Sequence, residues 1–134
     1  MTFSKSAALV IVLAACVNPT EPATPVALTM AGSLFDRGAP IPLTIVNSSN
    51  QSAFVGACGP TVSIEIEQRR RVWEPYAGGI CLAIYVFEPR ELAPGATISR
   101  TIWIEDAGTY RLTIQAGADA RRLLTVTSAS FLVR

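Results

Sequence analysis

The stretch Thr109-Tyr110-Arg111-Leu112-Thr113-Ile114-Gln115 decides the fold class, because its side chains alternate strictly between apolar and polar. In a β-strand, Tyr110, Leu112 and Ile114 would share one face and the residues between them the other. The stretch Thr61-Val62-Ser63-Ile64-Glu65-Ile66-Glu67 repeats this pattern. Such alternation is typical of antiparallel sheets with one face on a core, so both stretches predict strands of a half-buried antiparallel sheet.

Weaker strand patterns surround these two stretches, and no convincing helical periodicity follows residue 25. They cover residues 26–31, 41–47, 53–57, 82–87, 97–104 and 123–133. Clusters of Gly, Pro, Asn and Asp separate them, as turns require. Seven or eight short strands at this spacing predict an all-β fold, a single antiparallel β-sandwich over residues 26–134. Because Arg100 interrupts an apolar face, we expect a bulge or an edge position there.

Residues 1–15 have the pattern of an export signal. Lys5 supplies a positive start, and the apolar run that follows is too short to span a bilayer. The run ends in Leu13-Ala14-Ala15-Cys16, which resembles the bacterial lipoprotein box and implies cleavage before Cys16 and its acylation. An ordinary secretory signal with a chance cysteine is the alternative. Because Cys58 and Cys81 can pair in an oxidising compartment, lipid attachment accounts for the third cysteine.

Residues 16–25 are predicted to form a lipidated tether between this anchor and the sandwich. Proline at positions 19, 22 and 25 disfavours helix and sheet and favours an extended chain. The nine residues 17–25, at about 3.1 Å each in an extended chain, would reach roughly 28 Å. Val17, rather than Asp, follows Cys16, which in lipoproteins favours sorting to the outer membrane. We therefore expect an envelope protein held in the membrane by its N-terminal lipid, preferably in the outer membrane facing the periplasm.

Composition argues against several functions. Lys5 is one of eleven basic residues, so ten remain after residue 15 against ten acidic residues. Nucleic-acid binding needs a basic surplus, so no nucleic-acid partner is expected. The chain lacks histidine, and lysine is absent after residue 15, which removes the usual bases for a serine nucleophile. Glu65 and Glu67 could pair as carboxylates, yet they alternate with apolar residues on the solvent side of a strand. We expect no enzyme, no cofactor and no metal site.

Cys58 and Cys81 predict a structural disulfide. They are separated by 22 residues, and closing such a loop stabilises a fold by about 3 kcal/mol in the chain-entropy account. The alternative is a reactive or metal-binding thiol pair. No Cys-x-x-Cys spacing, histidine or acidic cluster supports that alternative.

The candidate binding residues lie between residues 69 and 80. Arg69, Arg70 and Arg71 form the one run of like charges and should lie at a hairpin turn. The simple interpretation is a solvated turn, and the alternative is a contact patch for anionic lipid or a carboxylate-bearing partner. In the segment 73–80, Trp73 and Tyr76 can supply large contact area at low entropic cost. For Trp73, packing in the sandwich core is the favoured alternative. For Tyr76, the sequence favours neither core packing nor a role in binding.

The segment Asp106-Ala107-Gly108-Thr109-Tyr110 resembles the D-x-G-x-Y signature of the tyrosine corner in immunoglobulin-like domains. The resemblance implies that Tyr110 opens a strand and that its hydroxyl bonds back to the corner backbone. Residues 43–49, 71–73, 92–95 and 108–112 are similar to segments of the intracellular proteinase inhibitor (BsuPI-like) family. Leu112 stands where immunoglobulin domains with the standard disulfide carry a cysteine, so that bridge is not expected.

The sequence thus predicts a lipid-anchored immunoglobulin-like β-sandwich that serves as a non-catalytic binding or structural module of the bacterial envelope. An envelope protein is the candidate partner. The alternative is an envelope protease inhibitor that uses an exposed loop, in which cleavage at Tyr76 or Arg90 would abolish inhibition.

Overall fold

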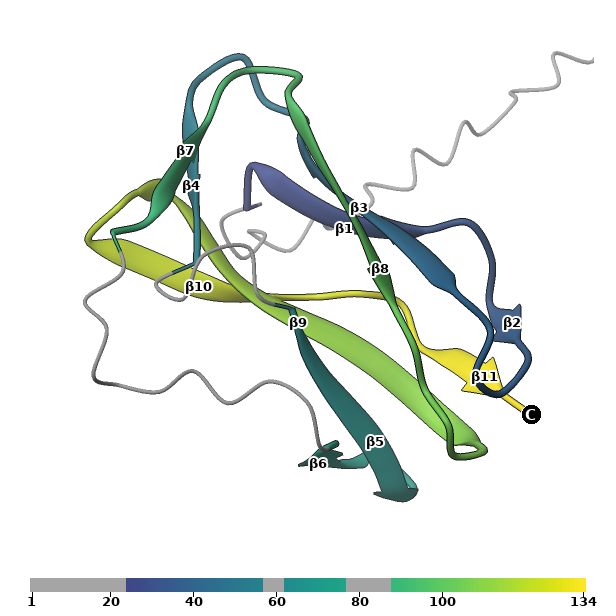
Figure 1. Ribbon diagram of the computed structural model, residues 1–134. Coiled ribbons are helices and arrows are strands. Elements are labelled where there is room, and N and C mark those ends of the chain that lie inside the picture. The colour runs from purple at the N-terminus through teal and green to yellow at the C-terminus, as the bar shows by residue number, and fades with distance from the viewer. Residues whose placement is uncertain (1–23, 57–61, 77–87) are drawn as a thin grey trace, which may run out of the picture.

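The computed structural model describes residues 24–56, 62–76 and 88–134, and these ranges are all-β (Figure 1). The strands are β1 (Val26–Met30), β2 (Leu34–Phe35), β3 (Ile41–Asn47), β4 (Ala53–Val55), β5 (Ser63–Arg69), β6 (Val72–Pro75), β7 (Arg90–Leu92), β8 (Thr97–Ile102), β9 (Gly108–Asp119), β10 (Arg122–Thr127) and β11 (Phe131–Val133). No helix in these three ranges is long and apolar enough to cross a membrane.

The strands form two sheets, as an immunoglobulin-like sandwich requires. The smaller sheet has the order β1-β3-β8 and is antiparallel throughout. The larger sheet has the order β2-β11-β9-β4-β7, with β10 paired to β9 and the β5–β6 hairpin joined to β9 through β5. Among the described strands, β2 and β11 form the one parallel pair. The predicted immunoglobulin-like β-sandwich is confirmed.

Strand β9 is the centre of the larger sheet because it pairs along both of its edges (Figure 1). Its first half lies between β11 and β5, and its second half lies between β10 and β4. Tyr110, Leu112 and Ile114 of β9 are buried, whereas Gln115 is exposed. The alternating stretch that predicts the fold therefore occupies the middle of the sheet.

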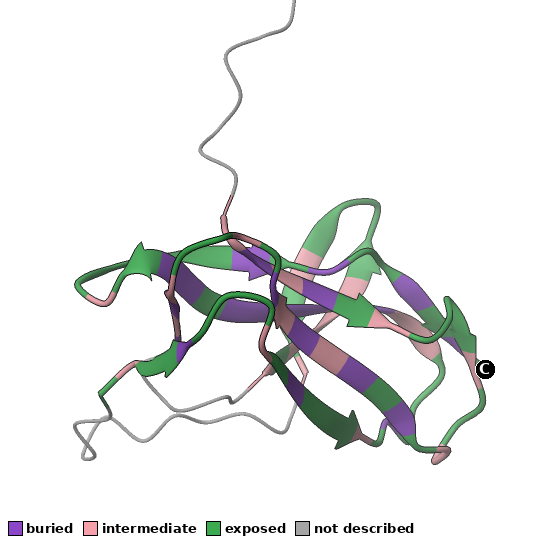
Figure 2. Cartoon of the chain, turned by 90° about the horizontal axis from the view of Figure 1, so that it is seen from above, coloured by how far each residue is buried: buried purple, intermediate pink, exposed green. Residues whose placement is uncertain are grey.

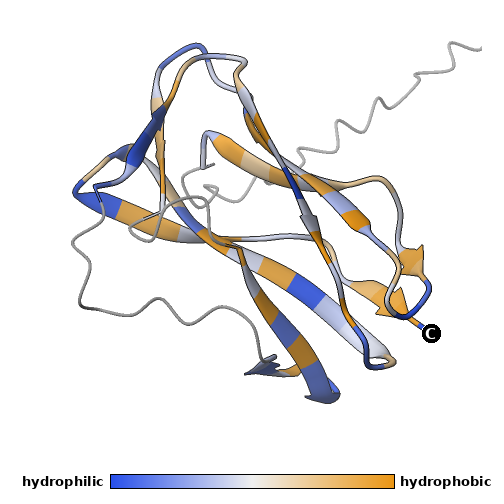
Figure 3. Ribbon diagram, in the orientation of Figure 1, coloured by the Kyte–Doolittle hydropathy of each residue, from blue (hydrophilic) through white to orange (hydrophobic). Residues whose placement is uncertain are grey.

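The core lies between the two sheets and draws apolar residues from both. Figure 2 shows buried residues alternating with more exposed ones along the strands, and Figure 3 shows the same alternation of hydropathy along β5. The core residues are Val26, Leu28, Ile41, Leu43, Ile45, Ala53, Val55, Leu92, Ile98, Ile104, Tyr110, Leu112, Ile114, Ala116, Val126, Phe131 and Val133.

Most predicted strands are present, with shifted ends. The prediction for 41–47 matches β3, while the predicted strand 123–133 is divided into β10 and β11. The short strands β2, β6 and β7 were not predicted, which raises the number in the described ranges to eleven. The predicted strand at 82–87 lies outside the described residues.

Arg100 lies at an edge of the smaller sheet. The register between β3 and β8 runs without interruption, and Arg100 pairs with the buried Leu43. Because β8 ends the strand order of this sheet, the Arg100 side chain can occupy the core-facing position and still be exposed. Of the two expected alternatives, the edge position is correct and the bulge is wrong.

Candidate binding surface

The three consecutive arginines lie at the tip of the β5–β6 hairpin. Arg69 ends β5, and Arg70 and Arg71 form the turn, which confirms the predicted position. Arg71 has a φ of 65°, a left-handed conformation that few residues other than glycine adopt. Its backbone N–H donates to Glu67 Oε1 at 2.6 Å. All three arginines are exposed, so the hairpin presents concentrated positive charge.

Trp73 lies on the outer face of the larger sheet, and the expectation that it packs in the core is wrong. In the hairpin, Trp73 pairs with Glu67, and antiparallel partners share a face of the sheet. The Arg111 guanidinium carbon lies 4.4 Å from the centre of the Trp73 ring. Arg111 Nε also donates to Glu65 Oε2 at 2.5 Å. The ring is therefore held between β6 and β9, outside the core.

The contacts around Trp73 orient it more than they stabilise the fold. The Arg111–Glu65 ion pair retains about a quarter to a third of its exposure, with side chains 30% and 25% accessible. Pairs of this kind contribute about 0–1 kcal/mol, and an exposed cation–π contact contributes about 0.5–1 kcal/mol. Their main effect is to hold a large ring in one position, so that the ring has little conformational freedom left to lose in a further contact.

Tyr76 is anchored on the tyrosine corner. Its ring packs edge-on against Tyr110, with centroids 5.2 Å apart, and its hydroxyl donates to Asp106 Oδ2 at 2.9 Å. The Tyr110 hydroxyl donates to the backbone oxygen of Asp106, also at 2.9 Å, which confirms the predicted corner. The bond to Asp106 raises the pKa of Tyr76, and burial raises the pKa of Tyr110 to about 12.

A small hollow lies at the other end of the hairpin and shares Glu65, the ion-pair partner of Arg111. It has a volume of about 270 Å³ and is lined by Ser63, Ile64, Glu65, Pro75, Tyr76 and Thr113. We call the exposed Arg69, Arg70 and Arg71 together with the half-buried Trp73 and Arg111 the hairpin site. The hairpin site combines charge at the tip with an oriented aromatic ring.

The two carboxylates considered for catalysis have structural partners. Glu65 accepts from Arg111, and Glu67 accepts from the Arg71 amide. Arg111 and Asp106 were not predicted as members of this surface. Alternation along residues 109–115 places Arg111 on the outer face, but its neighbours depend on the register between β5 and β9. Cys16, Cys58 and Cys81 lie outside the described residues, so acylation and the disulfide stay predictions.

No family model and no curated protein matches this chain. Three solved structures are similar to this chain. Northeast Structural Genomics Consortium target SoR45 is 12% identical, with 81% of this chain and 84% of that chain covered, at a TM-score of 0.49. The PmoD soluble domain from Methylocystis sp. ATCC 49242 (Rockwell) is 10% identical, with 86% of this chain and 95% of that chain covered, at a TM-score of 0.47. PapD-like domain 7 of human CEP192 is 11% identical, with 93% of this chain and 94% of that chain covered, at a TM-score of 0.42.

Proposed function

We propose that this chain is a lipid-anchored protein of the bacterial envelope whose sandwich binds a partner protein through the hairpin site, without catalysis. The observation that carries the binding role is the placement of Trp73 beneath Arg111 and beside the exposed Arg69–Arg71 tip. Tryptophan and arginine are enriched among residues that dominate binding energy. The three exposed arginines at the tip favour a partner surface that carries carboxylates.

The arrangement of the sheets supports a division between anchoring and binding. The tether predicted for residues 16–25 joins the sandwich at β1, which is in the smaller sheet. The hairpin site is on β5, β6 and β9 of the larger sheet. A chain anchored through Cys16 would therefore present the hairpin site from the opposite layer, where the anchor does not compete with a partner.

Protease inhibition is the alternative function, and a separate experiment tests it. A substrate-like inhibitor needs a loop with fixed ends, and both candidate cut positions beside residues 77–87 are fixed. Tyr76 is held by Asp106, and Arg90 of β7 pairs with Val55 of β4. Stoichiometric inhibition of a serine protease, lost on cleavage at Tyr76 or Arg90, would replace the partner-binding proposal. No inhibition across a protease panel is expected.

The anchor is tested by palmitate labelling of the full chain in a bacterial host. Wild type should incorporate label and lose residues 1–15, whereas Cys16→Ala should remain unlabelled and uncleaved. Val17→Ala is the matched control and should behave as wild type. Normal processing of Cys16→Ala would contradict lipid anchoring and leave the binding proposal to its own test.

The binding role is tested by charge removal at the tip. Arg69→Gln, Arg70→Gln and Arg71→Gln together should weaken capture of an envelope protein at least tenfold. The control replaces Arg37, Arg121 and Arg134 by glutamine, which removes the same charge from exposed positions elsewhere. Equal weakening by both triple variants would show non-specific electrostatic attraction and contradict the hairpin site.

A further inference from the structure

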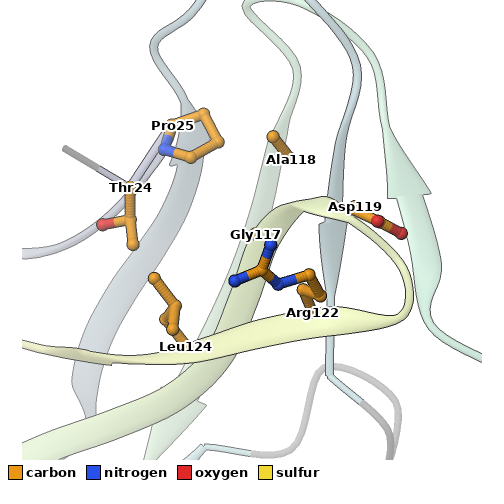
Figure 4. Close-up of a pocket in the computed structure, with 7 residues that line it drawn as sticks. All are labelled: Thr24, Pro25, Gly117, Ala118, Asp119, Arg122 and Leu124. Atoms are coloured by element: carbon orange, nitrogen blue, oxygen red, sulfur yellow. The ribbon is translucent and has the colours of Figure 1, made fainter. Parts of the chain in front are cut away.

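A second, chemically different hollow lies where the start of β1 meets the β9–β10 hairpin. It has a volume of about 330 Å³, and its walls are mainly apolar. The lining residues, all labelled in Figure 4, are Thr24, Pro25, Gly117, Ala118, Asp119, Arg122 and Leu124. We call this hollow the β9–β10 groove. It lies at the low end of the volumes of small-molecule sites, about 300–1,000 Å³.

Backbone geometry accounts for the hollow. The β9–β10 register shifts between Arg122 and Leu124, which marks an irregularity in the ladder. At Gly117 a Cβ atom would lie 2.6 Å from the Arg122 carbonyl oxygen, closer than real contacts allow. Gly117 and Ala118 therefore form a floor with almost no side-chain volume. Figure 4 shows Pro25 above Leu124 in the left half of the view, with Ala118 and Gly117 to their right.

The groove combines an apolar bed with one cation. Leu124 is 49% exposed and lines the groove with Pro25 and Ala118, so its side chain is open to a ligand in the groove. No ion pair involves Arg122 in the described part of the chain. Figure 4 shows its guanidinium turned toward Gly117, with the Asp119 carboxylate pointing away. Asp119 also accepts a hydrogen bond from the Arg121 backbone at 2.8 Å, so its charge is partly satisfied at the hairpin turn.

We infer that the β9–β10 groove binds a single-chain anionic amphiphile of the fatty-acid class. The carboxylate would pair with Arg122, and the hydrocarbon chain would lie on Pro25, Ala118 and Leu124. Charge complementarity favours this occupant. A carboxylate can form a charge-assisted hydrogen bond with the exposed Arg122 guanidinium, which a neutral chain cannot, and a small anion would leave the apolar walls uncovered. The inference does not depend on lipid anchoring or on the hairpin site.

The test is a titration of the full chain with dodecanoate below its micellar concentration. Backbone amide shifts of Gly117 and Ala118 and the side-chain Nε–H shift of Arg122 would be followed by NMR. These signals should move saturably in wild type. Arg122→Glu should weaken binding at least tenfold, and the adjacent Arg121→Glu, with the same change in charge, should stay within twofold. Ala118→Leu fills the groove and should also abolish the shifts.

Three outcomes would overturn the inference. Equal weakening by Arg121→Glu and Arg122→Glu would indicate general surface charge. Equal binding of dodecyl maltoside, which has an alkyl chain of nearly the same length and a neutral head, would show that the cation has no role. Shifts that do not saturate, or that are absent from the groove, would show that dodecanoate does not bind there. Circular dichroism of each variant checks that the sandwich is retained.

Discussion

The hydroxyl of Tyr110 donates a hydrogen bond of 2.9 Å to the backbone carbonyl oxygen of Asp106, four residues earlier. The Asp106 carboxylate accepts a second bond, from the hydroxyl of Tyr76. One residue of the corner therefore holds two tyrosines, one in β9 and one directly after β6. The β5–β6 hairpin is thereby fastened to the point where the chain crosses between the two sheets.

Removing the corner hydroxyl should destabilise the fold modestly. Tyr110→Phe keeps the buried ring but loses the bond to Asp106, and we expect the free energy of unfolding to fall by about 1 kcal/mol. Tyr76→Phe removes a more exposed bond, so its loss should be smaller. Urea denaturation measures both. A larger effect from Tyr76→Phe would contradict the corner as the principal fastening.

Stability should decline at alkaline pH because of Tyr110. Its folded pKa is about 12 against an ordinary value of 10.0, so folding favours the protonated phenol. This contribution is fully present below pH 10 and is lost as the pH rises from 10 to 12. Urea midpoints across this range should fall in wild type and fall less in Tyr110→Phe. Parallel curves for the two proteins would rule out this source.

Asn47 should be a major polar contributor to stability. It is fully buried. Its amide nitrogen donates to the carbonyl oxygens of Gln51, Leu92 and Ala93 at 2.7, 2.9 and 3.2 Å. Asn47→Ala removes all three bonds. The carbonyl oxygens of Gln51 and Ala93 keep other donors, the Ser49 hydroxyl and the Ala96 backbone N–H. We expect the free energy of unfolding to fall by about 2 kcal/mol.

Asn47→Asp provides the sharper test of this network. It keeps an acceptor for Ser49 but places a negative charge against three carbonyl oxygens. It should therefore be less stable than Asn47→Ala at neutral pH and should recover as the carboxyl is protonated in acid. Ser49→Ala, which loses an accessible hydroxyl, is the control and should cost less than about 1 kcal/mol. Equal stability of Asn47→Asp and wild type at neutral pH would contradict the assigned donor role.

Arg100 should protect the β8 edge against self-association. An inward-pointing charge on an edge strand is a known obstacle to edge-to-edge pairing. Arg100→Val should therefore increase the dimer fraction in sedimentation experiments. Thr101→Val adds the same apolar residue at an adjacent exposed position of β8. If both variants associate equally, added hydrophobicity rather than the lost charge is the cause.

The strands with strict alternation could be predicted from sequence, because burial on one face is a local pattern. This holds for residues 109–115 and, with a weaker pattern, for residues 41–47. It also holds for the tyrosine corner, whose signature is contiguous. The short strands β2 and β7 could not be predicted, since two or three residues carry no period and depend on their neighbours β11 and β4.

The position of Trp73 shows how far the candidate binding surface could be predicted from the sequence. A large apolar residue near a strand favours the core, but the face is decided by register with Glu67 across the turn. The stacking of Arg111 depends on a second register, between β5 and β9, which joins residues far apart in sequence. The β9–β10 groove likewise depends on a register shift between β9 and β10, which no local sequence pattern predicts.

The most direct test of the proposed binding role is site-specific photocrosslinking of the full chain in intact bacterial cells. A photoreactive residue replaces Arg70 at the hairpin tip or, as the control, Thr101 on the smaller sheet. We predict a discrete adduct with one envelope protein from position 70, lost when Arg69→Gln and Arg71→Gln are added, and none from position 101. The same adducts from both positions, or none from position 70, would contradict the hairpin site as the binding surface.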